Sequence, residues 1–418
     1  MSGGVDSSVA AALLREEGHD VVGVTLRLWG GAGDSGCCSV ADVEDARRVA
    51  AQLGIPHHVI DDSDAFLDKV VMPYVEAHAA GLTPNPCIEC NRHIKFRSLL
   101  DRAMRLGFDA LATGHYARVV HYAPAALGAL SAPSVASPSP SVASITAPPA
   151  YHRDTLLPPL PPPAPAPSLS VAGGDSSKGR VALLRGVDPA KDQSYVLSSL
   201  TQRELRYLVF PLGGLGKAEV RRIAAGMGLR TAAKPDSLDV CFVASTEGRK
   251  GFLSRFIELQ AARIVDVETG EAAGEIEAME LVTVGQRKGL GLNAGGRESS
   301  GTREAGRDSG RRYVLSLDVH AREVVVGSSS RARERGLIAG QVTWMDAPRC
   351  AGEQVLVQTS AHGRVRAAVL TEGSGPSIMM LEYDCPEQLV APGQTAALYS
   401  VECPEEVIGS GVVERGVR

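Results

Sequence analysis

The sequence lacks any long apolar run. No stretch reaches the roughly 18 consecutive apolar residues that a membrane-spanning helix requires, and the N-terminus lacks the charged start and apolar stretch of a secretory signal. We therefore expect a protein with no membrane partner. A length of 418 residues exceeds the usual size of one hydrophobic core, so we expect two or three domains.

Cysteine is sparse, and positive charge is not in excess. Eight cysteines are too few for a disulfide scaffold in 418 residues, so we expect thiols in a reducing compartment that serve chemistry. The net charge of -5 argues against a protein that is basic over its whole surface, although a local basic patch is compatible with it. Charge alone does not identify the partner.

Helical and strand patterns alternate over the N-terminal part of the chain. Strands are expected at 21–29, 57–60 and 108–112, and helices at about 7–18, 43–53 and 91–107. This alternation is typical of a parallel sheet covered by helices. Ligands of such sheets collect at the carboxyl ends of the strands.

Two segments lack the residues of a folded core. The stretch at about 123–178 is rich in Pro, Ala and Ser, and the stretch at about 295–311 is rich in Gly, Arg and Ser. The first is expected to be a disordered insertion between two strands of a hairpin, dispensable for catalysis, and the second a surface loop. Helical patterns follow over 201–228, and short alternating strands after about 261. We predict an α/β fold: a Rossmann-like parallel-sheet domain at 1–200, a small mixed domain at 201–330 and a C-terminal β-barrel at 331–418.

Residues Ser2 to Ser8 read S-G-G-V-D-S-S just ahead of a helical pattern. Exposed N–H groups and the helix dipole bind an anion at such a place, so this is a predicted phosphate cradle; the plain alternative is a glycine turn with a serine cap. The spacing and the lysine of the Walker motif are absent. The string matches the PP-loop of ATP pyrophosphatases, which cleave ATP to AMP and pyrophosphate. That resemblance implies adenylation of a substrate.

Cys87 and Cys90 form a C-x-x-C motif, which is half of a common zinc site. A second C-x-x-C is missing. Cys37 and Cys38 are adjacent, and adjacent ligands would strain a tetrahedral site. Redox or sulfur chemistry is therefore the preferred interpretation of these cysteines.

Cys90 has the surroundings of a nucleophile. A helix is expected to begin at Asn91, and the dipole of this helix, with Arg92 and Lys95 nearby, should lower the pKa of the thiol. Cys241 lies in a mixed polar and apolar stretch and, taken alone, is equally well explained as a buried strand cysteine.

Seven motifs occur in one order along nearly the whole chain, the insertions excepted. They are residues 2–8, 36–39, 83–96, 112–118, 191–195, 239–242 and 285–290. In this order they resemble the tRNA-uridine 2-sulfurtransferases, or 2-thiouridylases, of bacteria and organelles. The resemblance implies a PP-loop domain of the adenine nucleotide alpha hydrolase type, a central tRNA-binding domain, and ATP-dependent 2-thiolation of the wobble uridine of tRNA.

The resemblance also implies roles for the motif residues. Cys90 matches the nucleophile and Cys241 the cysteine that carries the persulfide. ATP is expected at Ser2, Gly3, Gly4, Val5, Asp6, Ser7, Ser8, Leu26 and Gly114. The target base is expected at Asn85, Pro86 and Cys87, and other parts of the tRNA at His115, Lys191, Asp192, Gln193 and Gln394. From residue type alone, Asp192 is a helix-start carboxylate and Lys191 a surface charge.

The implied cofactors are ATP and Mg²⁺, and the implied partners of this monomer are tRNA and an upstream sulfur donor. The loop would align the α-phosphate of ATP for attack by the uridine 2-oxygen, while Mg²⁺ neutralises the departing pyrophosphate. The persulfide on Cys241 would attack the activated carbon directly, or Cys90 would break the persulfide and form a disulfide with Cys241. The base must leave its stack, which is easiest in an anticodon loop. The expected compartment is a bacterium-like cytoplasm, a mitochondrion or a chloroplast.

Three features depart from the family pattern. The sequence begins on the loop itself, without the strand that leads into it, so we expect weaker placement of the loop. Position 87 is Cys where many relatives have Asp, so Cys87, Cys90 and Cys241 are alternative ligands of a [4Fe–4S] cluster with one open iron. Residues 360–363 lack an expected basic side chain. The rival functions are another PP-loop ligase or amidotransferase, and a non-catalytic RNA-binding or metal-binding module.

Overall fold

The structure is a computed structural model that describes residues 1–29, 39–122, 179–236, 240–243, 246–292 and 311–418. The chain divides into two compact units, residues 1–120 with 182–418, and residues 121–181. Cys37, Cys38, Asp239, the insertion expected at 123–178 and nearly all of the loop expected at 295–311 lie outside the described residues.

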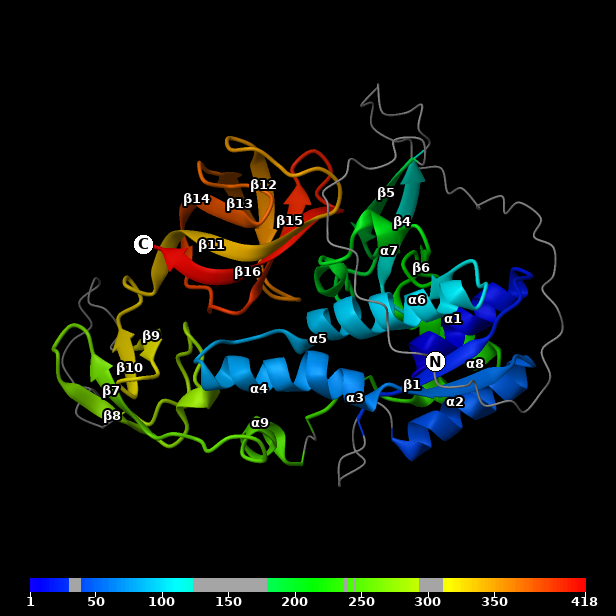
Figure 1. The fold of residues 1–418 in the computed structure, drawn as a ribbon, viewed down its shortest axis with the longest axis horizontal. Coiled ribbons are helices and arrows are strands. Elements are labelled where there is room, and N and C mark those ends of the chain that lie inside the picture. Colours follow the sequence, from blue (N-terminus) through cyan, green and yellow to red (C-terminus); the bar gives the residue numbers. More distant parts are fainter. Residues whose placement is uncertain (30–38, 123–178, 237–239, 244–245, 293–310) are drawn as a thin grey trace. The chain divides into compact units, whose positions relative to one another are not determined.

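Parallel strand pairs and helices build the N-terminal part of the first unit (Figure 1). After α1 (Val5–Glu16), strand β1 (Gly23–Arg27) pairs in parallel with β2 (His57–Asp61), and α2 (Val40–Leu53) connects them. A second parallel pair joins β3 (Leu111–Ala112) to β6 (Leu208–Val209). The expected parallel arrangement is confirmed, although the described strands form two pairs in place of one continuous sheet.

Two long helical segments follow β2. The first comprises α3 (Ser63–Phe66), η1 (Leu67–Val71) and α4 (Met72–Ala79); the second comprises α5 (Pro86–Glu89), η2 (Cys90–Leu99) and α6 (Leu100–Arg105). The middle parts, η1 and η2, have π-helical hydrogen bonding. The second segment begins at Pro86, not at Asn91 as predicted, because the Asn85 side chain accepts a hydrogen bond from the Cys87 N–H and proline suits the first helical turn.

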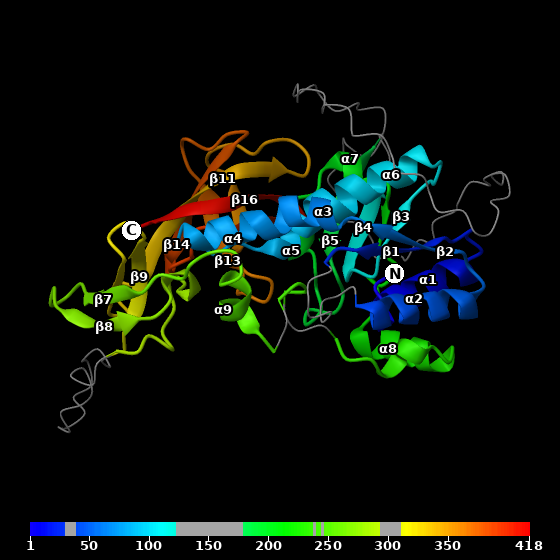
Figure 2. The same ribbon diagram turned by 60° about the horizontal axis from the view of Figure 1, so that its bottom comes forward.

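The central part of the chain has short helices and a four-stranded sheet. The helices are α7 (Gln202–Leu205), α8 (Lys217–Gly226) and α9 (Gly248–Leu253), with 3₁₀ turns η4 (Tyr195–Leu197), η5 (Arg230–Ala233) and η6 (Met279–Leu281). In spatial order the strands are β8 (Ala272–Ile276), β7 (Ala262–Asp266), β10 (Glu323–Gly327) and β9 (Tyr313–Asp318). Figure 2 shows α1, α2 and α8 close to one another, and these three helices share one apolar core.

The C-terminal strands close into a six-stranded barrel, which confirms the predicted β-barrel. In spatial order they are β11 (Arg333–Trp344), β14 (Ile378–Gln388), β13 (Arg366–Leu370), β12 (Gln354–Gln358), β15 (Thr395–Ser400) and β16 (Glu406–Val417), with β11 also paired to β16. Strand β5 (Arg180–Arg185) adds to β16, and β4 (Ala117–Tyr122) lies next to β5, as expected for the two strands that flank the insertion.

The apolar cores follow this division. Val9 of α1, Val49 of α2 and Val220 of α8 are fully buried in one cluster, and the barrel interior forms another around Leu337, Val357 and Leu398. Burial of such side chains contributes roughly 1.5–3 kcal/mol each to folding. In the described part of the chain, no helix combines the length and apolarity needed to cross a membrane.

Candidate active site

The glycine-rich loop turns tightly over the N-terminus of α1. Gly4 is the N-cap residue, and the Ser8 hydroxyl donates to the Gly4 carbonyl oxygen at 2.8 Å. Gly3 has a φ of 70°, and a Cβ added there would lie 2.2 Å from the carbonyl oxygen of Asp42. Only glycine fits at position 3. Because the first N–H groups of a helix have no partner within it, this turn presents donors to an anion.

The end of β3 brings Gly114 against this loop. A Cβ on Gly114 would lie 2.8 Å from the carbonyl carbon of Asp6 and 2.9 Å from the Ser7 nitrogen. The Tyr116 hydroxyl donates to Asp6 Oδ1 at 2.7 Å. Burial, and then this hydrogen bond, raises the pKa of Tyr116 far above its ordinary value, so the hydroxyl remains a donor. The predicted nucleotide residues Ser2–Ser8 and Gly114 therefore lie together.

The two cysteines assigned to sulfur chemistry lie in one apolar cluster. Cys90 is buried in it with Phe66, Ile94 and Phe242, and Cys241 packs against it, as does the predicted nucleotide residue Leu26. Cys90 and Cys241 are 151 positions apart in the sequence (241 minus 90), and neither is in a disulfide. The fold therefore places the two predicted sulfur residues in one apolar cluster.

The expected reason for Cys90 reactivity needs correction. Cys90 lies one full turn inside the helical segment that begins at Pro86, whereas the influence of the helix dipole is confined to the first turn. Cys87 occupies that first turn, and its N–H is bound by Asn85 at 3.1 Å. Although the Cys87 side chain reaches solvent, the protein around it raises the pKa of the thiol, and the charge of Lys95 opposes this shift.

An iron–sulfur site is not assembled by these cysteines. Among the residues with described positions, which include Cys87, Cys90 and Cys241, no three His, Cys, Asp or Glu side chains lie close enough to hold a metal ion together. The three thiols therefore do not fit the [4Fe–4S] ligand set considered above, and we derive no step through such a cluster.

The segment expected at the target base is held by the barrel. Asn85 caps the helix that begins at Pro86, and the preceding Thr83 accepts a hydrogen bond from the Gln394 amide at 2.9 Å. The Thr83 N–H donates to the Pro392 carbonyl oxygen at 2.8 Å. The structure thus brings the predicted tRNA residue Gln394 next to the predicted base-contacting segment 85–87.

The other predicted tRNA residues have protein partners. Asp192 is buried; its Oδ1 accepts from the N–H groups of Gly186 and Ser194, and its Oδ2 from Arg185 at 2.8 Å. Gln193 exchanges hydrogen bonds with the Tyr116 main chain at 2.9 Å. The structure supports the interpretation of Asp192 as a structural carboxylate at the start of a turn.

His115 is partly buried among aromatic rings. Its Nδ1 lies 2.8 Å from the Thr113 hydroxyl, and its ring lies 5.7 Å from that of Phe96 and 6.0 Å from that of Phe210. Burial, with a smaller effect from the Lys95 charge, lowers the pKa of His115 well below its ordinary value. A neutral imidazole at this position can accept or donate a hydrogen bond but carries no charge for a phosphate.

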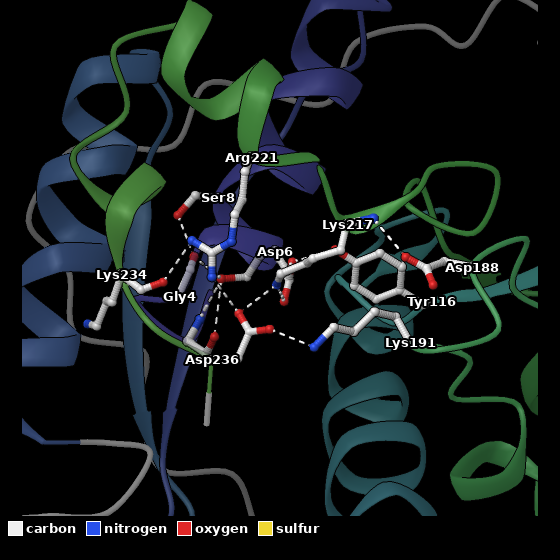
Figure 3. A network of polar contacts seen from close by, with 12 residues as sticks. Gly4, Asp6, Ser8, Tyr116, Asp188, Lys191, Lys217, Arg221, Lys234 and Asp236 are labelled. Atoms are coloured by element: carbon white, nitrogen blue, oxygen red, sulfur yellow. Dashed lines mark hydrogen bonds and ion pairs between the residues drawn. The ribbon is translucent and has the colours of Figure 1, made fainter. Parts of the chain in front are cut away.

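An ion-pair network beside the loop was not predicted from the sequence (Figure 3). Lys217 Nζ lies 2.8 and 2.9 Å from the two carboxylate oxygens of Asp6 and 2.8 Å from Asp236 Oδ1. Arg221 and Lys191 also bind Asp236, each at 2.8 Å. Burial alone would raise the pKa of Asp236, but hydrogen bonds and charge from Lys191 and Lys217 lower it to about 2. One feature of the sequence could have pointed to this network, since Asp236 lies shortly before the Cys241 motif.

Comparison with known proteins identifies the family. The model described as the tRNA methyl transferase HUP domain matches residues 1–133 and 170–245, and that described as the tRNA methyl transferase PRC-barrel domain matches 250–328. The tRNA-specific 2-thiouridylase MnmA of Heliobacterium modesticaldum is 36% identical over 100% of this chain and 92% of the relative. The MnmA proteins of Roseiflexus castenholzii and Chloroflexus aurantiacus are 39% and 38% identical, over 99% of this chain and 98% and 97% of their own.

The chain belongs to the tRNA-specific 2-thiouridylase family. This confirms the resemblance drawn from the seven ordered motifs, and the α/β fold class with a C-terminal barrel agrees with it. In this member of the 2-thiouridylase family, a glycine loop covers the start of α1, and two thiols share one cluster with Leu26. Lys217 and Asp236 join that arrangement although no motif match pointed to them.

Proposed function

We propose that this protein uses ATP to thiolate position 2 of the wobble uridine in tRNA. Support comes from family membership together with one observation: Cys90 and Cys241 pack in one cluster that Leu26 also contacts. Because a predicted nucleotide residue of β1 packs against the cluster of the two thiols, activation and sulfur delivery can act on one base. The domain boundaries at 200 and 330 remain part of this proposal.

ATP activation is proposed at the N-terminus of α1. The uridine 2-oxygen attacks the α-phosphate; an O–P bond forms, the bond to the β-phosphate breaks, and pyrophosphate leaves. The N–H groups of the loop bind phosphate oxygens, and Gly3 and Gly114 allow the close approach of the backbone segments. Mg²⁺ would enter with ATP, held mainly by its phosphates, and would supply neutralisation of phosphate charge. Asp6, the carboxylate of the loop, already binds Lys217 through both oxygens and would have to share them with the ion.

Sulfur transfer is proposed at the thiol cluster. Cys241 carries the terminal sulfur as a persulfide, and this sulfur replaces the adenylated oxygen with release of AMP. If the persulfide attacks directly, Cys90 then breaks the bond to the Cys241 sulfur and a disulfide forms; if Cys90 attacks first, free sulfide reacts with the base and the same disulfide forms. Both routes require the two sulfurs to meet. An upstream sulfur donor and a reductant restore the starting state.

The bound tRNA is proposed to contact the segment Asn85–Cys87, Lys191 and the barrel residue Gln394. The hydrogen bond from Gln394 to Thr83 and that from Asn85 to Cys87 fix this segment relative to the barrel. Because this segment is held in place before tRNA binds, less conformational entropy is lost when the flexible anticodon loop binds to it. The Gln193 side chain accepts a hydrogen bond from the Tyr116 N–H, and the His115 ring lies among aromatic rings, so we assign both a structural role.

Mass spectrometry of tRNA nucleosides tests the function. The full chain is incubated with unmodified tRNA, ATP, Mg²⁺ and a protein persulfide as the sulfur donor, and the wobble nucleoside is expected to gain sulfur in place of oxygen only when ATP is present. Cys90→Ser and Cys241→Ser should abolish the product, because each removes one sulfur of the pair. Cys350→Ser changes an exposed thiol of the barrel region and serves as the matched control.

The same assay separates the rival functions. With a methyl donor added to the mixture, a methyl group gained by the nucleoside would support the methyl transfer named in the family descriptions. A wild type that consumes ATP in the presence of tRNA but adds no sulfur would support a ligase. Absence of ATP turnover in the presence of tRNA would point to a binding module. We favour thiolation because neither methyl transfer nor ligation requires two cysteines in one cluster.

A further inference from the structure

Three cationic side chains converge on one carboxylate beside the nucleotide loop (Figure 3). Asp236 Oδ1 lies 2.8 Å from both Lys217 Nζ and Arg221 Nη2. The other oxygen, Oδ2, lies 2.8 Å from Lys191 Nζ. Charged donors therefore surround a single anionic group. The same set of donors suits a phosphate group, which offers more oxygens than a carboxylate and accepts strong hydrogen bonds from lysine and arginine.

Lys217 places this cluster directly against the nucleotide loop. Its Nζ lies 2.8 and 2.9 Å from the two carboxylate oxygens of Asp6, the second residue of α1. Since we propose that the phosphates of ATP bind at the N-terminus of α1, this ammonium lies at the edge of the same site. The Lys217 side chain is only 12% exposed, which limits screening of its charge by water and salt. The loop and the cations beside it are therefore close enough to serve one polyphosphate.

Helix α8 orients two of the three cations before any ligand arrives. Lys217 is the first residue of the helix and Arg221 lies four positions later, so both side chains lie on one side of it. Arg221 Nη1 donates to the carbonyl oxygens of Ala232 at 2.8 Å and Lys234 at 3.0 Å. Its other nitrogen, Nη2, donates to Asp236. Because the guanidinium is already fixed, little conformational entropy is lost when an anion takes the place of the carboxylate.

We propose that Lys217 and Arg221 form a binding site for the pyrophosphate end of ATP, and that the Asp236 carboxylate occupies this site until the nucleotide displaces it. Phosphate oxygens then replace Asp236 Oδ1 as the partner of both cations, while Lys191 remains with Oδ2. Asp236 is therefore an internal competitor that lowers the affinity for polyphosphate. This inference rests on the proposed function, because ATP cleavage supplies the pyrophosphate, but its test needs neither tRNA nor sulfur.

Calorimetric titration of the full chain with pyrophosphate, and separately with AMP, tests this site. Asp236→Asn keeps the size of the side chain but removes the competing charge, so it should bind pyrophosphate about threefold or more tightly than the wild type. Arg221→Met removes a charged donor and should weaken pyrophosphate binding about tenfold, as should Lys217→Met. AMP lacks the pyrophosphate end of ATP and should bind to every variant with nearly the wild-type affinity.

Arg222→Met is the matched control for Arg221→Met. Arg222 is the next residue of α8, is 75% exposed and pairs with Glu219 at 3.4 Å, so its replacement should leave both affinities at the wild-type value. Thermal unfolding verifies that each variant is folded.

The direction of the Asp236→Asn effect decides the proposal. A carboxylate that only holds the fold together would give weaker or unchanged pyrophosphate binding when it is neutralised, and that result in a folded protein would overturn the inference. Equal losses of pyrophosphate and AMP affinity in Arg221→Met would overturn it as well, as would a wild type and an Asp236→Asn protein that both fail to bind pyrophosphate. The expected affinities in a protein that makes no 2-thiouridine would refute the proposed function alone.

Discussion

Gln394 of the barrel donates a hydrogen bond from Nε2 to the carbonyl oxygen of Thr83 at 2.9 Å, across 311 positions of sequence. The contact is reinforced at Gly393, where an added Cβ would lie 2.9 Å from the Thr83 nitrogen, and where φ is 90°. The loop between Val390 and Gln394 therefore fixes the chain immediately ahead of Asn85. The barrel thus shapes the segment that we assign to the target base.

Replacement of Gln394 by Ala removes this contact. We expect the free energy of unfolding to fall by about 1 kcal/mol, the usual net value of one hydrogen bond. The KM for tRNA should rise more than the KM for ATP, since the segment at 83–87 is displaced while the loop at Gly3 is not. Steady-state kinetics with each substrate varied in turn measures both constants. Gln388→Ala, at an exposed barrel position, is the control, and equal increases of the two KM values would contradict this assignment.

Replacement of Gly114 by Ala should displace the nucleotide loop. The new Cβ would meet backbone atoms of Asp6 and Ser7 at 2.8 and 2.9 Å, and backbone cannot move aside as a flexible side chain can. We expect a stability loss of about 1–3 kcal/mol and at least a roughly tenfold rise of the KM for ATP. Thermal unfolding and ATP titration check these effects. Gly226→Ala, at an exposed helix end where nothing outside its own helix lies within 4 Å of the new Cβ, should leave the KM for ATP unchanged and should not lower stability.

The buried His78 should make the protein less stable in mild acid. Burial, helped by the charge of Arg249, lowers its pKa from 6.5 to about 4, although Nδ1 donates to the Glu280 carbonyl oxygen at 3.0 Å. Between these values the unfolded chain binds more protons than the folded chain, so stability falls as the pH drops through this window.

Urea denaturation over pH 7 to 4 measures this dependence. His78→Gln cannot titrate, so wild type and variant should diverge by roughly 3 kcal/mol over the window. Parallel curves would show that His78 does not govern the acid response, and His320→Gln, at an exposed turn, should follow the wild type.

Glu334 in the barrel should have the opposite pH dependence. It is 1% exposed; burial raises its pKa from 4.5 to about 7, while the Val390 N–H and the charge of Arg366 act against that shift. The protonated form is favoured in the folded state, so its contribution is fully present below pH 4.5 and is lost as the pH rises through about 7.

Glu334→Gln should therefore gain stability over wild type as the pH rises. The difference in the free energy of unfolding should grow by roughly 3 kcal/mol between pH 4.5 and 8. Chemical denaturation across this range measures it, with Glu372→Gln at an exposed turn as the control. If the difference in the free energy of unfolding stays constant with pH, Glu334 does not titrate in this range.

Local sequence patterns predicted an element correctly where they marked a helix end or an alternating strand. The helix predicted at 43–53 is α2, closed at Gly54 with φ 66°, and the short alternating strands predicted after about 261 include β12 and β15. The segment Ser63–Ala79 was not predicted. Pro73 within it indicates a helix start, yet the π-helical turn η1 ahead of the proline continues the helix into α4.

Contacts between distant residues set the limit of prediction at the site. The family resemblance placed Cys90 and Cys241 in one reaction, and the fold brings them into one cluster. No local pattern distinguishes Lys217 from other helix-start lysines, because its partner Asp6 is 211 positions away. The roles of the individual site residues and the domain boundaries at 200 and 330 stay predictions.

Strand β5 pairs with β16 through Leu183 and Leu184, so a piece of the N-terminal half completes the edge of the barrel. The two halves therefore share main-chain hydrogen bonds as well as side-chain contacts. A fragment that starts at residue 331 would leave the Glu406–Val407 edge open to pairing with another copy. We expect such a fragment to self-associate, and the intact chain to lose its barrel and its β5 strand in a single cooperative transition.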